Sequence, residues 1–205
     1  MTNTTPQAAV IPTADARRVL DFWFGAPASA GWDTTRAQWF TKSEAFDASM
    51  REAFLPLWRA MHAGAHAGWA QSPLGACARI VVLDQMPRNI FRGDARSFAS
   101  DAQALETARE TVASGADRLL PTPFHRMFCY MPFEHSESLA DQNEAVRLMT
   151  ALRDESGGRV DEVDWALKHR AVIARFGRFP HRNALLGRQG TEAETAFLRE
   201  PGSSF

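Results

Sequence analysis

Two short polar segments hold most of the side chains in this sequence that could bind a small molecule. The first has acidic, amide and guanidinium groups at Asp84, Gln85, Arg88, Asn89 and Arg92. The second has guanidinium, imidazole and amide groups at Arg178, His181, Arg182, Asn183 and Arg188. The guanidinium groups of arginine and the side-chain amides of asparagine can donate hydrogen bonds to carboxylate and phosphate oxygens. The two segments would therefore bind a carboxylate or phosphate if they face each other. The alternative is structural: the asparagines would cap turns, and the arginines would bond helix carbonyls.

A third polar segment, EHSE at residues 134–137, contains a histidine suited to acid–base chemistry. Imidazole exchanges a proton near neutral pH, and a nearby carboxylate can fix its tautomer. Adjacent residues of a helix do not face each other, so the partner of His135 must come from elsewhere in the chain. The sequence has no HExxH motif, no paired-cysteine spacing and no glycine-rich phosphate loop. We therefore predict no metal and no cofactor.

The formal net charge of −1 is a cancellation between two neighbouring segments. Residues 165–191 contain no acid and six cations, namely Lys168, Arg170, Arg175, Arg178, Arg182 and Arg188. Residues 134–164 contain nine acids and three arginines, a balance of −6. Segments of opposite charge are expected to pair, so we do not expect nucleic acid as a partner. RNA binding through residues 168–188 is the least favoured alternative, and it would weaken steeply with salt.

Composition indicates one globular domain of 205 residues, with 45% hydrophobic and 23% charged residues. The two cysteines, Cys77 and Cys129, lie in apolar runs and are too few for a disulfide framework, which favours a reducing compartment. No run of eighteen apolar residues occurs, and the first residues lack the features of a signal peptide. We expect a cytoplasmic protein with no membrane contact and a single domain over residues 1–205, of which 1–12 form a flexible tail.

Helical spacing of apolar residues runs through the chain, whereas alternating strand patterns are missing from the sequence. Thr13 and Gly25 delimit the first expected helix, and Thr191 with Glu194 forms a capping box for the last. About eight or nine helices with short connections favour an all-helical stack of antiparallel hairpins.

Prolines set several of the expected helix ends, because a proline ring cannot continue the backbone ladder. Pro56 should break or bend the second helix. Pro87 should end the helix that begins at Pro73, and a later helix should end near Pro132.

Two further helix assignments concern residues close to the polar segments. Phe98 should lie on the apolar face of a long helix that follows Gly93. Ser138 and Asp141 should form a capping box for another helix.

Four strings of this sequence, VLDFWFG, LDQMPRNIFRG, PFEHSESLADQ and FGRFPHRNALLGR, resemble the bacterial family known as domain of unknown function 924. The likeness extends from about Val19 to Phe197. Small departures are Met86, where the family usually has phenylalanine, and Ser138, where an acid is common. The resemblance implies a tetratricopeptide-like, right-handed stack of helical hairpins, and it implies no particular activity. Three of the four family strings contain the three polar segments, which makes a shared polar pocket our working hypothesis.

We predict that one cavity gathers these polar groups and binds a small anionic molecule. The predicted binding residues are Asp84, Gln85, Arg88, Asn89, Arg92, Arg178, Arg182 and Asn183. The predicted catalytic residues are His135, His181 and Glu134: a histidine would carry a proton, and Glu134 or Asp84 would orient it. Whether any reaction takes place is left open. The alternative is an interaction scaffold whose groove binds a peptide or protein partner, as solenoid curvature permits.

Overall fold

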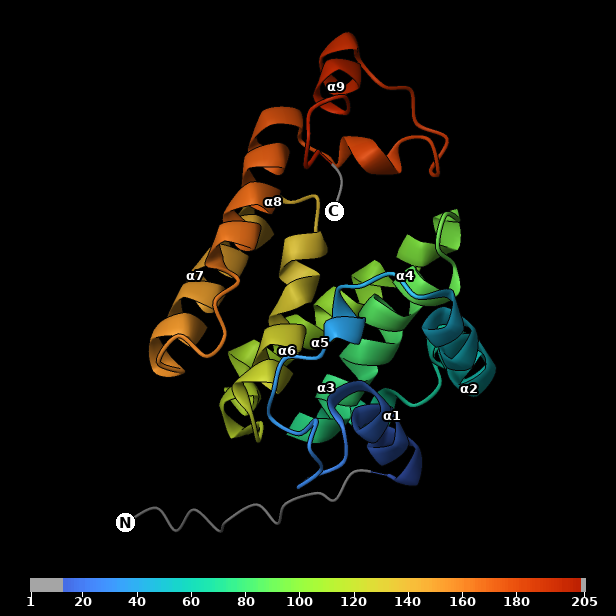
Figure 1. The fold of residues 1–205 in the computed structure, drawn as a ribbon, viewed down its shortest axis with the longest axis vertical. Coiled ribbons are helices and arrows are strands. Elements are labelled where there is room, and N and C mark those ends of the chain that lie inside the picture. Colours follow the sequence, from blue (N-terminus) through green and yellow to red (C-terminus); the bar gives the residue numbers. More distant parts are fainter. Residues whose placement is uncertain (1–12, 204–205) are drawn as a thin grey trace.

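The computed structural model describes residues 13–203, and Figure 1 shows a chain built from helices. The α-helices are α1 (Ala14–Phe24), α2 (Glu44–His62), α3 (Pro73–Ile80), α4 (Met86–Ile90), α5 (Asp101–Ala113), α6 (Pro123–His135), α7 (Leu139–Glu155), α8 (Val163–Phe176) and α9 (Glu192–Phe197). No strand occurs within these residues. The predicted all-helical fold is therefore confirmed, while its tetratricopeptide-like character stays a prediction. The expected flexible tail, residues 1–12, lies outside the described residues.

One apolar cluster connects the helices, from Ala16 in α1 to Ala166 in α8. Figure 1 shows α7 and α8 as neighbouring antiparallel helices beside α6, and these three elements contact one another. Buried residues recur at helical spacing on α7, as at Leu148 and Leu152, so one face of this helix packs against the core. This packing holds the end of α6, which carries part of the EHSE segment, against α8.

The long apolar helix does not end at Pro87, contrary to the prediction. α3 continues through a π-helical turn, Val81–Gln85, directly into α4. Pro87 has no amide hydrogen, so it cannot donate to the carbonyl of Leu83, four residues earlier, as an α-helical residue would. The hydroxyl of Ser100 donates to this carbonyl instead, at 2.5 Å. The chain therefore stays helical past the proline and keeps Asp84 in the interior, fully buried.

We expect Ser100→Ala to lower the free energy of unfolding by about 2 kcal/mol, because two buried groups lose their partner. Ser100 is fully buried, and its hydroxyl also accepts a hydrogen bond from Trp58 Nε1 at 3.0 Å. Urea denaturation followed by circular dichroism measures the loss. Ser114→Ala is the matched control, since this hydroxyl bonds carbonyls at the exposed end of α5 and its loss should cost no more than about 0.5 kcal/mol. Equal effects of the two substitutions would contradict the role given to Ser100.

Two other prolines also lie inside helices. Pro56 is within α2, so it does not break this helix. Pro56 and Glu52, whose carbonyl loses its helical donor, are both exposed, and water can bond that carbonyl. Pro132 lies within α6, which continues one turn beyond the expected end. The last turn of this helix therefore carries Glu134 and His135.

Two further expectations near the polar segments need correction. Phe98 lies in a separate 3₁₀ turn before α5 and not on the face of that helix. Ser138 occupies the N-cap position of α7, but its side chain makes no capping bond. Asp141 instead accepts a hydrogen bond from the Ser136 hydroxyl at 2.7 Å. The predicted cap at Thr13 and the capping box of α9 are present.

Candidate functional site

A buried carboxylate and an imidazole from two different helices form the centre of the site. Asp84 comes from the π-helical turn, and His135 ends α6. His135 Nδ1 lies 2.7 Å from Asp84 Oδ1 in a hydrogen bond. Gln85 Nε2 donates to the other carboxylate oxygen at 2.6 Å. The partner of His135 thus comes from elsewhere in the chain, as the spacing of helical residues requires.

Two arginines from the first and second polar segments meet at one carboxylate, Asp101, beside this pair. Arg88 donates to both oxygens of Asp101, at 2.9 and 3.0 Å, and also to the carbonyl of Asp84. Arg182 donates to Asp101 at 3.3 Å and to the carbonyl of His135 at 3.1 Å. The structure therefore brings parts of all three polar segments together.

Two aromatic rings hold the guanidinium group of Arg182 in place. Its central carbon lies 4.6 Å from the ring centroid of Phe98 and 4.5 Å from that of Phe179. Rings in such positions attract a cation through their quadrupole. Burial, and after it the charge of Arg88, lowers the pKa of Arg182 to about 10. The group is therefore still a cation at neutral pH.

The charges around His135 leave it as a proton acceptor. Burial opposes ionisation of Asp84, but Arg88 and His135 hold the pKa of this carboxyl below its ordinary value. Burial, and then Arg88, lowers the pKa of His135, against the opposite effect of Asp84. At pH 7 the carboxylate is ionised and the imidazole is neutral, with its hydrogen on Nδ1. Among residues 13–203 nothing bonds Nε2, so this atom can take a proton from a bound molecule.

Glu134 faces a second histidine, His169 of α8, and not His135. Its Oε2 is 3.6 Å from His169 Nδ1, and its Oε1 has no hydrogen-bond partner in the described part of the chain. The distance suits an ion pair, but His169 Nδ1 already donates to the carbonyl of Trp165 at 2.8 Å. Burial raises the pKa of Glu134 to about 8 and lowers that of His169 to about 4. We therefore assign a neutral carboxylic acid beside a neutral imidazole at pH 7.

Three other predicted residues bond carboxylates outside this cluster. Asn89 Nδ2 donates to Asp47 Oδ1 at 2.7 Å, and Arg92 Nε donates to Asp47 Oδ2 at 2.8 Å. Arg178 Nε pairs with Glu194 at 2.6 Å. These contacts tie the ends of the polar segments to α2 and α9.

The rest of the second segment folds around Glu137. Arg188 donates to both oxygens of this carboxylate, at 2.7 and 3.0 Å, and to Asn183 Oδ1 at 2.9 Å. The amide of Phe179 donates to Glu137 at 2.8 Å. The ring of His181 lies 5.5 Å from that of Phe179, and burial lowers the pKa of His181 to about 4.

Sequence reasoning missed the carboxylates that hold the arginines. Arg188 pairs with Glu137 of the acidic segment 134–164, as the charge balance suggested. Arg178 and Arg182 pair with acids outside that segment. Asp101 gave a usable signal, because it lies just beyond the family string LDQMPRNIFRG, which contains Arg88. Asp47 lies on the buried face of α2 with Met50 and Phe54, but nothing in the sequence links it to Arg92.

The predicted site does not coincide with the hollow beside Trp39 or with that beside Arg17, since other residues line both. Over residues 13–203, no three His, Cys, Asp or Glu side chains are grouped so that they could hold a metal ion. None of the helices in this range has the length and apolar character that crossing a membrane requires.

Comparison with known proteins gives the chain a family. Residues 19–202 match the model of a family described as bacterial proteins of unknown function, DUF924. A solved structure of a protein of unknown function from Agrobacterium tumefaciens is 34% identical, with a TM-score of 0.77, over 91% of this chain and 97% of that one. No curated protein matches. Because the family model spans most of the sequence and all three polar segments, the chain belongs to the DUF924 family of bacterial proteins.

Proposed function

We propose that the protein binds a small anionic molecule, a carboxylate or a phosphate, beside Arg88, Arg182 and His135, and that His135 accepts a proton from it. The hydrogen bond between His135 and the buried Asp84 carries this proposal, because it fixes the tautomer that leaves Nε2 as a base. The side chains of His135 and Arg88 are 15% and 21% exposed, so a solute can reach them.

Unused arginine donors, rather than net positive charge, support anion binding. Two carboxylates, Asp84 and Asp101, formally balance the two arginines. However, Arg182 Nε is buried without a hydrogen-bond partner in the described part of the chain, and none of the hydrogen bonds of Arg88 uses its Nε. An anion that reaches such N–H groups would gain charge-assisted hydrogen bonds.

Inorganic phosphate and succinate are the probes that test the site. Either anion should shift the Cε1–H NMR signal of His135, assigned by its loss in His135→Gln. It should also raise the pKa of His135, because a nearby negative charge favours the imidazolium form. Arg88→Gln should weaken binding by about tenfold, the effect of losing one charge-assisted hydrogen bond. Arg92→Gln is the matched control, since it removes the same charge from a residue that pairs with Asp47.

Two outcomes would count against the proposal. A His135 signal that neither anion shifts, in the folded wild-type protein, would exclude anion binding beside this residue. Equal weakening by Arg88→Gln and Arg92→Gln would indicate only a general effect of surface charge. The first result does not depend on whether either variant folds.

The two other functions predicted from the sequence have less support. The arginines of residues 168–188 are largely engaged, since Arg178, Arg182 and Arg188 each pair with a carboxylate. This pairing weighs against an RNA-binding surface. Peptide binding in a groove of the helical stack stays a prediction, and no contact described above favours it.

A further inference from the structure

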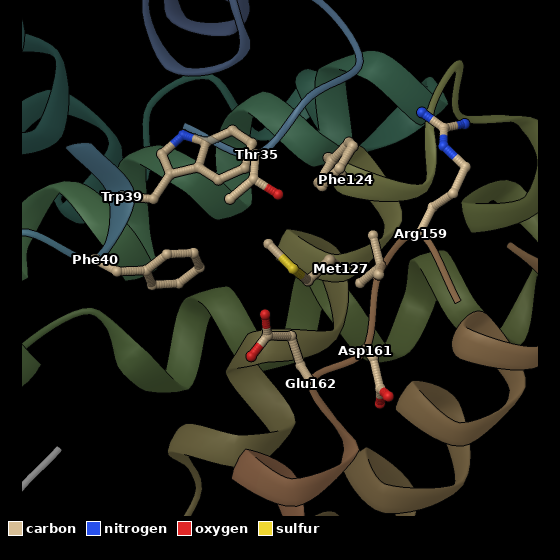
Figure 2. A pocket seen from close by; sticks show the side chains of 9 residues that line it. Thr35, Trp39, Phe40, Phe124, Met127, Arg159, Asp161 and Glu162 are labelled. Atoms are coloured by element: carbon tan, nitrogen blue, oxygen red, sulfur yellow. The ribbon is translucent and has the colours of Figure 1, made fainter. Parts of the chain in front are cut away.

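A second, separate hollow lies where the chain after α1, the start of α6 and the loop between α7 and α8 meet (Figure 2). Its volume is about 40 Å³, enough for a group of one or two heavy atoms. One side of its wall is aromatic or apolar and the other is acidic, and the side chains concerned are Trp39, Phe40, Phe124, Met127, Asp161 and Glu162.

Glu162 supplies the polar group that points into this hollow. Figure 2 shows its carboxylate turned toward the space between Phe40 and Met127, whereas Asp161 points away. Glu162 is half-buried, and its carboxylate makes no hydrogen bond or ion pair with any residue that the structure describes. Burial, and then the charge of Asp161, raises its pKa. The carboxylate has therefore lost part of its water without gaining a counter-ion.

The cation in the wall, Arg159, is not the counter-ion of Glu162. Its guanidinium pairs with Asp33 at 2.8 Å, and Figure 2 shows it directed away from Glu162. Counting Arg159 with the two acids of the wall and with Asp33 gives a formal charge of −2. The hollow thus has a negative charge that no described side chain compensates.

A hydrogen bond and ring packing hold Trp39 in the aromatic wall, whereas Phe40 is 56% exposed. Trp39 Nε1 donates to the carbonyl of Trp23 at 2.8 Å, and its ring lies 4.9 Å from that of Phe128. Phe40 stands at 84° to the Trp39 ring, with 6.2 Å between the centroids. Rigid aromatic faces beside a carboxylate attract cations and need little reorganisation on binding.

We propose that this hollow binds the head group of a small ammonium cation, a protonated primary alkylamine, with Glu162 as counter-ion and Trp39 and Phe40 as aromatic walls. An ammonium group can donate to the carboxylate while its positive charge lies against the rings. A bare metal ion would need several more oxygen ligands than this wall offers. The site shares no residue with the one around His135, so either can fail without the other.

Methylammonium chloride is the probe, because its two heavy atoms match the volume. It should shift the indole N–H signal of Trp39 in a saturable manner, with the signal assigned by its loss in Trp39→Phe. Methanol, the neutral analogue of equal size, and sodium chloride at the same ionic strength should not. Glu162→Gln should weaken binding by at least about fivefold. Asp161→Asn removes the same charge from a neighbour that points away, and binding should stay within about twofold of wild type.

Each contrary result has a definite meaning. An equal response to methanol would show an apolar hollow without preference for a cation. Equal weakening by Asp161→Asn and Glu162→Gln would show attraction by surface charge alone. Either result overturns the proposal, and the comparison with methanol uses the wild-type protein only.

Discussion

Asp84→Ala is expected to lower the free energy of unfolding by about 3–5 kcal/mol at pH 7, the cost of breaking a buried ion pair by removing one partner. Asp84 is fully buried and accepts hydrogen bonds from His135 and Gln85, while Arg88 lies 3.3 Å away. The substitution would leave His135 Nδ1–H without an acceptor and Arg88 with one carboxylate fewer. Urea denaturation followed by circular dichroism measures the change.

Asp154→Ala is the control for this result. Its carboxylate pairs with Arg153 at 2.8 Å but is 63% exposed, so its removal should change stability by less than about 1 kcal/mol. A loss below about 1 kcal/mol for Asp84→Ala would mean that the buried pair contributes no more than a surface pair.

Glu134→Gln is expected to change how stability depends on pH. Burial raises the pKa of Glu134 to about 8, whereas in the unfolded chain the carboxyl ionises near its ordinary value of 4.5. The folded state therefore holds a proton that the unfolded state releases, and stability is lost as pH rises from 4.5 through 8. The loss is about 1.4 kcal/mol per pH unit, which amounts to about 4–5 kcal/mol over this window. Glutamine keeps the shape of the neutral acid but cannot ionise, so the variant should lack this loss.

The measurement is the difference in unfolding free energy between Glu134→Gln and wild type from pH 5 to pH 8.5. Buried histidines act in the opposite direction, because burial lowers the pKa of His125 to about 3 and those of His169 and His181 to about 4. Their contribution is lost as pH falls below 6.5, and it cancels in the difference. Glu52→Gln, on the exposed side of α2, should leave the wild-type pH dependence unchanged. A difference that does not vary with pH would contradict a neutral Glu134.

Local signals in the sequence were sufficient to predict the helices. Thr13 and the Thr191–Glu194 box bond their own helix, so their effect is visible within four residues of sequence. The helix ends expected at prolines were wrong because the effect of a proline depends on residues far away in the sequence. Whether Pro87 ends a helix depends on a donor for the carbonyl of Leu83, and that donor, Ser100, comes from another element. No local pattern reveals such a partner.

The residue types of the candidate site could also be predicted, but their pairing could not. Asp84, Arg88 and His135 stood out because polar groups interrupt apolar helices. Their arrangement depends on contacts between distant segments, such as Arg182 with Asp101, which are 81 positions apart. A surface acid and a site acid look alike in the sequence, so the assignment requires the packing of α4, α5 and α6.

The π-helical turn also determines how a change of length in this part of the chain would affect α4. An α-helix turns by about 100° per residue, and a π-helical turn accommodates one residue more than an α turn does. Deleting one residue from Val81–Gln85 would therefore leave an ordinary α turn and keep α4 in nearly the same orientation relative to α3, whereas inserting one residue would rotate every side chain of α4 by about 100°. Arg88 and the buried Ile90 would then leave their present partners together. This stretch can therefore lose one residue with less effect on the register of α4 than it can gain one.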